Sequence, residues 1–251
     1  MSSLYYTKLI QRNPYLDKLV GYFPFNANAG DTSGKGNDGA VVNAGSLSFS
    51  AGKVGNAIDF SNTTALNYVA WNDLANFSFT DGTNDVAFSI SIWVKVTSFS
   101  TVGNWLFNKR GLATNMEYQL VIVNGQLFFY KWSGGGTANY QEIKSTATNA
   151  IPTASWQNII YTNKATNDIN DGKFYLNGSL LTVTRTTVGT YAGMIDTTAI
   201  SRLGNGAWAL SENIKHRGLV DEFYIWKGRE LTASEASDIY AKGNSGVSLL
   251  T

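Results

Sequence analysis

The residues of this chain that could perform acid, base or nucleophilic chemistry are few and scattered. Cysteine is absent and His216 is the only histidine, which excludes disulfides, thiolate metal sites, cysteine nucleophiles and histidine clusters. Asp221 and Glu222 are adjacent in a segment of strand character, so alternation predicts side chains on opposite faces. Retaining glycoside hydrolysis instead needs two carboxylates about 5 Å apart. The predicted strands that are most like a catalytic strand, residues 118–123 and 126–132, carry only one acidic residue, Glu117, at their edge. The sequence therefore argues against an enzyme.

Two further motifs are expected to carry no chemistry. His216 stands between Lys215 and Arg217, and nothing in the sequence resembles the nucleophile elbow that a Ser-His-Asp triad would need. We expect this basic cluster to be a solvated loop end. The three glycines at 134–136 are not followed by the Lys-Ser/Thr pair of a phosphate-binding loop, and a flexible hairpin end is the simpler interpretation.

Aromatic residues in the predicted connections are the remaining sign of function. Sugars stack on such rings through their apolar C–H faces, while amide side chains supply directional hydrogen bonds. The alternative is that these rings cap the ends of the fold or pack on a neighbouring subunit. The candidate glycan-binding residues are Trp105, Trp132, Tyr140, Tyr191 and Trp208, with Asn205, Asn139 and Gln141 as hydrogen-bonding partners.

Strands joined by tight turns must position these residues. Residues 89–96 alternate polar and apolar side chains, which is the period-2 pattern of a half-buried strand. Asn124-Gly125 and Asn177-Gly178 are strong hairpin signals, because both turn residues accept a positive φ. Strands are predicted over residues 89–96, 118–123, 126–132, 156–162, 173–176, 179–184 and 218–226.

One helix is predicted, over residues 233–242. Thr232 and Glu235 fit a capping box, and Gly243 stands where a left-handed C-cap belongs. Long polar loops are expected at residues 71–85 and 133–151, and a shorter one at 165–172. We see no repeat or linker, so residues 19–251 are predicted to form one domain, preceded by an N-terminal arm at residues 1–18.

Composition supports an all-β domain and excludes several classes of function. Of the 251 residues, 43% are hydrophobic and 15% are charged, against about 25% charged in an average globular protein. The 25 glycines fit a fold with many turns. A net charge of +1 gives no long-range field for gathering phosphates, so we expect no nucleic-acid partner. No apolar run approaches the ~18–20 residues that span a bilayer, and we expect no membrane partner.

Several segments, taken in order, resemble the laminin-G-like, concanavalin A-like jelly roll. They include an aromatic strand followed by an Asp-x-Ser-Gly-x-Gly-Asn-x-Gly loop, a central strand that ends in Trp-Val, and a final strand followed by Leu-Thr-Ala-Ser-Glu. Gln157 and Asn158 depart from the family by replacing two histidines. The matching segments are residues 19–26, 31–39, 53–60, 88–96, 156–159, 174–178, 219–226 and 231–235. The resemblance implies a β-sandwich of two antiparallel sheets with one short C-terminal helix.

The resemblance also implies a structural Ca²⁺ between the early loop and the final strand. Carried over residue by residue, its ligands would be the carboxylates of Asp31 and Asp221 and a main-chain oxygen near Gly36. Calcium favours such hard oxygen ligands. The alternative is that Asp31 folds its own turn through side-chain to backbone hydrogen bonds and that Asp221 caps a neighbouring amide. Hydrolases of this fold carry Glu-x-Asp-x-Glu on one strand, and this sequence has no such motif.

Two functions remain open. Residues 1–20 lack an apolar run of signal-peptide length, which favours a non-enzymatic structural component of a virus or phage particle, such as a capsid-decoration, head-fibre or tail protein. Its partners would be other particle proteins, bound through residues 1–18, with further copies of the chain and host-surface glycans as additional partners. The alternative is a secreted or surface-displayed carbohydrate-binding or adhesion module.

Overall fold

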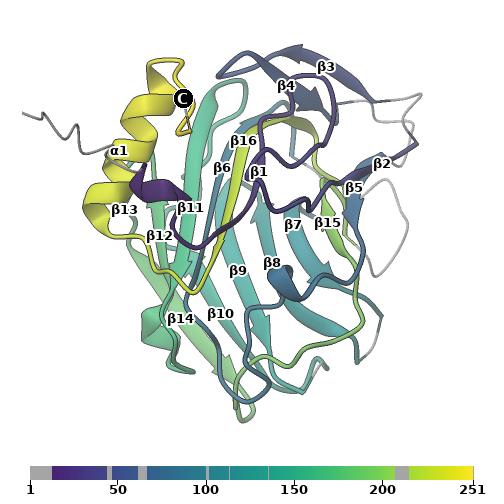
Figure 1. Cartoon of the computed structure of the whole chain (residues 1–251). Coiled ribbons are helices and arrows are strands. Elements are labelled where there is room, and N and C mark those ends of the chain that lie inside the picture. Colours follow the sequence, from purple (N-terminus) through teal and green to yellow (C-terminus); the bar gives the residue numbers. More distant parts are fainter. Residues whose placement is uncertain are drawn as a thin grey trace, which may run out of the picture.

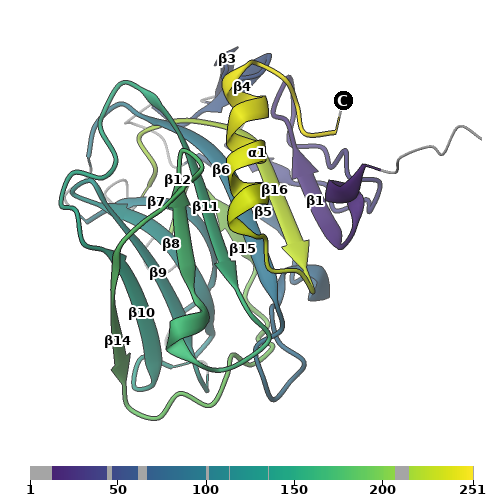
Figure 2. The ribbon, with the colours of Figure 1, turned by 90° about the vertical axis from the view of Figure 1, so that its left-hand side faces the viewer.

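Two antiparallel sheets pack face to face, and one α-helix lies on the outer side of one of them (Figures 1 and 2). This architecture confirms the predicted concanavalin A-like jelly-roll sandwich. The computed structural model describes residues 13–43, 47–61, 67–99, 102–112, 114–134, 136–206 and 215–250.

The first sheet, called sheet 1 below, carries the helix. Its central strands are the longest, and β1 pairs with β16 beside the main path. The order of neighbouring strands is β13 (Ser179–Leu180), β12 (Lys173–Leu176), β11 (Trp156–Asn163), β6 (Phe88–Val96), β16 (Gly218–Lys227), β4 (Asn56–Asp59) and β3 (Ser48–Ala51), with β1 at Leu19–Phe23.

The second sheet, called sheet 2, carries most of the aromatic candidates. Four of its strands form consecutive antiparallel neighbours along the chain, from β7 to β10. The order is β14 (Val183–Val188), β10 (Tyr140–Ser145), β9 (Gln126–Trp132), β8 (Met116–Val123), β7 (Asn104–Arg110), β15 (Ser201–Leu203), β5 (Tyr68–Trp71) and β2 (Ala40–Val42).

Both predicted hairpin turns are present. Asn124 and Gly125 have φ values of 47° and 78°, and Asn177 and Gly178 have 50° and 78°, as a two-residue turn between twisted strands requires. The run predicted at 179–184 is divided, however. Its first part pairs with β12 in sheet 1, whereas the chain then crosses to sheet 2, where β14 pairs with β10 along six residues. The edge of β10 offers that longer ladder.

The expected loop at residues 133–151 contains a strand that the sequence pattern did not reveal. β10 has one aliphatic residue facing inward, Ile143, and its other inward side chains are Gln141 and Ser145. Because the alternation is carried by polar residues, the segment reads as a loop. The other long segment, 71–85, holds only the short 3₁₀ helix η3 (Ala75–Phe77) and a bridge between Thr80 and Asp85.

Aromatic rings fill the space between the sheets. Phe129 of sheet 2 and Tyr161 of sheet 1 stack with centroids 3.7 Å apart, and Phe79 stacks on Phe88 at 4.1 Å. Burying each such side chain contributes roughly 1.5–3 kcal/mol. The core therefore fixes the relative position of the two sheets and the outward direction of the alternate residues.

Helix α1 (Ala233–Asn244) begins with the predicted capping box between Thr232 and Glu235. The predicted end at Gly243 is wrong, because the helix continues to Asn244 and Ser245 is the C-cap. Gly243 instead lies against a tryptophan of sheet 1. A Cβ at this position would stand 2.5 Å from Nε1 of Trp93, so the glycine allows the helix to approach the sheet.

Residues 13–18 pack on the same domain as the strands. Tyr15, in the short 3₁₀ helix η1 (Pro14–Leu16), is buried beneath α1, and its carbonyl accepts a hydrogen bond from Nε1 of Trp226 at 2.8 Å. Asn13 donates to the carbonyl of Leu249. Residues 1–12 of the predicted arm lie outside the described residues, and its role as an anchor stays a prediction. No helix in the described part of the chain has the length and apolar character needed to cross a membrane.

Candidate functional site

A pocket of about 310 Å³ opens on the outer face of sheet 2, across strands β7 to β10. Alternation along β9 supplies its base, because Leu127, Phe129 and Lys131 face inward and the residues between them face outward. The pocket is lined by Val102, Trp105, Arg110, Gln119, Val121, Val123, Tyr130, Trp132, Thr137 and Tyr140.

The aromatic residues of the pocket form a continuous surface. Tyr130 stacks on Trp132 with centroids 5.6 Å apart and planes inclined by 15°. Tyr140, on the neighbouring strand β10, lies 6.1 Å from Tyr130 at 55°. Phe128 extends the row along β9, 6.0 Å from Tyr130. Tyr130 and Tyr140 are partly exposed, so their rings are available to a bound molecule.

Arg110, at the end of β7, lines this pocket beside both of its tryptophans. Its guanidinium lies 4.7 Å from the ring centre of Trp132 and 5.5 Å from that of Trp105. Nη1 donates to Oε1 of Gln119 at 2.6 Å. Burial lowers the pKa of Arg110, but a guanidinium stays protonated in proteins. The guanidinium covers the two tryptophans, each only 4% exposed.

Two polar atoms in the pocket have no partner among the described residues. They are Nε of Arg110 and Nε1 of Trp105, and both are buried. Unpaired buried donors are rare in folded proteins and each one calls for an explanation. Both atoms are shielded from solvent, so they lie at the base of the pocket and not on its open surface.

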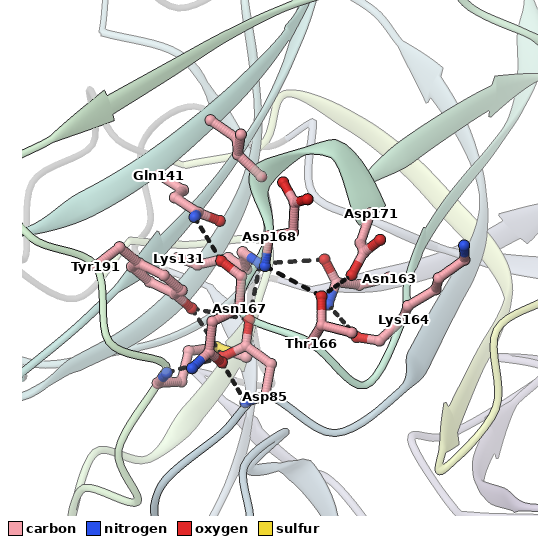
Figure 3. A network of polar contacts seen from close by, with 12 residues as sticks. Asp85, Lys131, Gln141, Asn163, Lys164, Thr166, Asn167, Asp168, Asp171 and Tyr191 are labelled. Atoms are coloured by element: carbon pink, nitrogen blue, oxygen red, sulfur yellow. Dashed lines mark hydrogen bonds and ion pairs between the residues drawn. The ribbon is translucent and has the colours of Figure 1, made fainter.

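A buried ion pair supports the strand beneath the pocket. Lys131 stands between Tyr130 and Trp132 in sequence but faces inward, where its Nζ lies 2.7 Å from Oδ2 of Asp85. Figure 3 shows the hydroxyl of Tyr191 directed at the same carboxylate, at 2.8 and 2.9 Å from its two oxygens. This network ties β9 to the loops around it and holds the outward residues of β9 in place.

The structure brings together three of the predicted glycan-binding residues, Trp105, Trp132 and Tyr140. Asn205 is buried and does not line the pocket; its carbonyl accepts from Asn108. Its neighbour Gly206 lies against Trp105, where a Cβ would stand 2.5 Å from the ring. Trp208 lies outside the described residues.

The three other candidates serve the structure. Tyr191 belongs to the buried Asp85 network (Figure 3). Gln141 faces inward and donates to the carbonyl of Asn167, and Asn139 accepts from the backbone of Thr190. Sequence reasoning missed Arg110 and Gln119, for which no local motif gives a signal.

The predicted calcium ligands are engaged in hydrogen bonds. Asp31 accepts from the backbone N–H groups of Tyr22, Ser33 and Asn37 and from the Ser33 hydroxyl, which uses the four acceptor positions of a carboxylate. This geometry fits the alternative in which Asp31 folds its own loop. Gly36, with φ of 71°, lies within that loop.

Asp221 is similarly occupied. It accepts from the backbone N–H groups of Lys53, Val54 and Glu222 at 2.7 to 2.8 Å. Among the described residues no cluster of three or more His, Asp or Glu side chains is suited to a metal ion. These carboxylates therefore do not fit a calcium ion in this arrangement, and the ion stays a prediction. If calcium is bound in solution, a chelator lowers the melting temperature and Asp221→Ala removes that sensitivity; an unchanged wild-type melting temperature excludes the ion.

The expectation that Asp221 and Glu222 point to opposite faces is wrong. Glu222 has φ of 45° and is an extra residue in a β-bulge of β16. It therefore shares the outer side of sheet 1 with Asp221, where it accepts from the hydroxyls of Tyr22 and Tyr224. Burial and the neighbouring Glu222 raise the pKa of Asp221 to about 7. These carboxylates serve as hydrogen-bond acceptors for the surrounding chain.

Two other expectations about polar residues need correction. Glu117 is fully buried within β8 and forms an ion pair of 2.6 Å with Lys109. His216 and Lys215 are buried, so this cluster is no solvated loop end. The His216 ring packs edge-on to Phe60, and burial lowers its pKa to about 4. The short β-bridge between Asn205 and Lys215 draws the cluster into the fold.

Comparisons with known proteins agree with this fold. The family model of the concanavalin A-like lectin/glucanases superfamily matches residues 62–237. No curated protein matches the chain. Among solved structures, domain 4 of AbnA, a GH43 extracellular arabinanase from Geobacillus stearothermophilus in complex with arabinotriose, has 20% identity and a TM-score of 0.65, over 89% of this chain and 98% of that one.

Toxin binding domains are also similar. The binding domain of Paraclostridial Mosquitocidal Protein 1 has 16% identity and a TM-score of 0.69, over 90% of this chain and 52% of that chain. The ligand-binding domain of botulinum neurotoxin serotype D, in complex with N-acetylneuraminic acid, has 18% identity and a TM-score of 0.62, over 90% and 51%. This chain thus spans about half of these domains, and at such identities the similarity shows the fold. The family match covers most of the chain, which belongs to the concanavalin A-like lectin/glucanase superfamily.

Proposed function

We propose that this protein is a non-enzymatic carbohydrate-binding module and that the pocket on the outer face of sheet 2 is its binding site. One observation carries the proposal. Partly exposed aromatic rings from β9 and β10 meet two buried tryptophans, a guanidinium and an amide around a single pocket of about 310 Å³. Sugar-binding sites combine stacking surfaces with a few directed polar groups in this way.

The solved relatives support this choice of ligand class. One similar domain holds arabinotriose and another holds N-acetylneuraminic acid. The described acidic residues that were considered for catalysis are buried and paired: Glu117 with Lys109, and Glu222 with two tyrosines. They serve the fold in this structure, which favours binding over hydrolysis.

Tyr140→Ala tests the site with little risk to the fold, because Tyr140 is partly exposed at the start of β10. We expect the wild type to be retained on at least one polysaccharide of an array. The variant should lose roughly 2- to 12-fold in affinity by calorimetry, since stacking on an aromatic ring contributes roughly 0.5–1.5 kcal/mol. Tyr240→Ala, which removes a partly exposed tyrosine on α1, is the matched control and should bind as the wild type does.

Two results would count against the proposal. The first is a wild type that no glycan on the array retains. The second is equal binding by the wild type and the Tyr140→Ala variant, which would place any glycan elsewhere on the molecule. Hydrolysis of a bound oligosaccharide, detected as newly formed reducing ends, would show that the protein is an enzyme.

A further inference from the structure

The charge state of the pocket identifies the class of sugar more narrowly. Arg110 is the one residue among the described lining residues that is charged at neutral pH. A guanidinium has five N–H groups, and for Arg110 the structure records one acceptor, Gln119. Its Nε is buried without a partner in the described chain. The cation is thus placed and oriented but mostly unpaired.

The strands of sheet 2 supply no counter-ion. Their two acidic residues are Glu117 and Glu142. Glu117 is paired with Lys109, and Glu142 accepts the hydroxyl of Tyr130 across the β9–β10 pair. No ion pair of Arg110 occurs within the described residues. A half-buried charge without a partner is costly, so a ligand that brings a negative charge gains more here than a neutral one.

Two further cations, Arg202 and Lys144, lie on the same face, and neither forms an ion pair within the described residues. The guanidinium of Arg202, on β15, lies 5.8 Å from the ring centre of Tyr68, and its Nη1 donates to the carbonyl of Arg110. Nζ of Lys144, on β10, lies 5.4 Å from the ring centre of Phe128. Together with Arg110 these cations outnumber Glu142, the one acidic residue at an outward position of these strands, so the local field of this face is positive, although the whole chain is nearly neutral.

The position of Arg110 over the two tryptophans further limits the class of sugar that can bind. Arg110 already lies over Trp105 and Trp132, so a neutral sugar cannot stack on those rings without displacing the guanidinium. Nε is shielded and one N–H group of Nη1 is donated to Gln119, so the free donors are at the end of the guanidinium, on Nη1 and Nη2. Two such donors side by side match the two oxygens of a carboxylate. The rings left partly exposed beside Arg110, Tyr130 and Tyr140, can contact the sugar itself.

We propose that the pocket selects acidic saccharides, with Arg110 binding the carboxylate of a uronic or sialic acid unit and Tyr140 contacting its ring. The inference rests on the proposed glycan-binding function and adds the charge of the ligand. Arg110 is then the specificity-determining residue, and Trp105 and Trp132 position its guanidinium.

The test is calorimetry of the full chain with two matched pairs of ligands. Trigalacturonate is compared with its methyl ester, which keeps the rings and removes the charge, and sialyllactose is compared with lactose. We expect the acidic member of at least one pair to bind roughly 10-fold tighter or more, since hydrogen bonds to charged groups are strong. Added salt should weaken that binding.

Variants connect the effect to Arg110. Arg110→Gln should abolish the preference for the acid, and Arg110→Lys should keep part of it, because lysine keeps the charge and loses the fork. Arg185→Gln is the matched control, since Arg185 lies on β14 and donates to carbonyls of the loop beneath. Melting temperatures of all variants confirm that they are folded.

The outcomes separate the two proposals. Equal affinity for acid and ester, with loss of both in Tyr140→Ala, would overturn the acidic preference and leave glycan binding standing. A sulfated trisaccharide that binds as tightly as the carboxylated one would also overturn it, in favour of general anion attraction. A chain that binds neither pair nor any glycan on the array would refute both.

Discussion

Two arginines, one beside each sheet, lie over aromatic rings and differ in the groups that accept their hydrogen bonds. Arg229, near the helix on sheet 1, lies 5.9 Å from the ring centre of Tyr15 and donates to two backbone carbonyls and to the carboxylate of Glu235. Arg110, on sheet 2, donates only to Gln119 among the described residues. The chain itself supplies the strong acceptors around Arg229. Around Arg110 most acceptors are left for a bound molecule to supply.

The tyrosines of the two faces differ in how far the fold encloses them. On sheet 1 the stacked rings of Tyr22 and Tyr224, 4.3 Å apart, direct their hydroxyls to Glu222 and Ser248. On sheet 2 the ring of Tyr140 reaches the pocket surface. Aromatic content alone therefore does not distinguish a binding face from a packed one. The distinction lies in which polar groups have partners.

From this comparison of the two sheets, we expect the largest effect on stability when a tryptophan of sheet 1 is replaced. Trp226 is fully buried and its Nε1 donates to the carbonyl of Tyr15. Trp226→Ala should lower the free energy of unfolding by about 3–5 kcal/mol, as large-to-small changes in a core do, with glycan affinity unchanged where the protein is folded. Chemical denaturation and calorimetry measure the two quantities. A variant of normal stability with weakened binding would reverse the assignment of the two faces.

A buried residue that lies away from the pocket, His216, should lose its contribution to stability as the pH falls. Burial lowers the pKa of His216 from 6.5 to about 4, so the folded state binds fewer protons than the unfolded chain. The contribution is complete above pH 6.5 and is lost as the pH falls toward 4. The linkage amounts to roughly 2 kcal/mol at pH 5. The raised pKa of Asp221 acts in the opposite direction over the same range, so the test compares two proteins. Between pH 7 and pH 5 the wild type should lose roughly 2 kcal/mol more stability than His216→Gln, measured by denaturation at both pH values. Identical pH profiles of the two proteins would exclude His216 as the cause.

Removal of single hydroxyls should give the smallest effect and the sharpest comparison. Tyr224→Phe removes the group that bonds Glu222 and accepts from the N–H of Leu249, and should cost about 1–2 kcal/mol of stability. Tyr140→Phe, at the pocket, should change stability by less than about 0.5 kcal/mol. Equal losses in the two variants, measured by denaturation, would mean that Tyr140 is also fixed by the fold.

The sequence could predict the elements whose signals are local. The Asn124-Gly125 turn fixes the register of β8 and β9, and the capping box at Thr232 fixes the start of α1. Strand β10 escaped because Gln141 and Ser145 occupy inward positions. The bulge at Glu222 was not predicted either, because a pattern of strict alternation does not allow for an inserted residue.

The candidate site was predictable only in part, for a similar reason. Trp105, Trp132 and Tyr140 are aromatic residues at strand ends, and composition is enough to select them. Arg110 reaches the same pocket through the pairing of β7 with β8, whose register shifts twice, the second time beside Arg110 itself. Such shifts depend on packing across the sheets, so no short stretch of sequence places this residue beside Trp132.

The positions of the two chain ends have a consequence for how the domain can be displayed. Asn13 is bonded to Leu249 on the helix side of sheet 1, and Figure 2 shows α1 and both ends of the described chain on the side away from β8, β9 and β10. A tether attached at either end would therefore hold the domain by its back. On a support coated with the protein through either end, the Arg110 pocket would face the solution. Ligands too large to enter the space between the domain and the support would still reach the pocket.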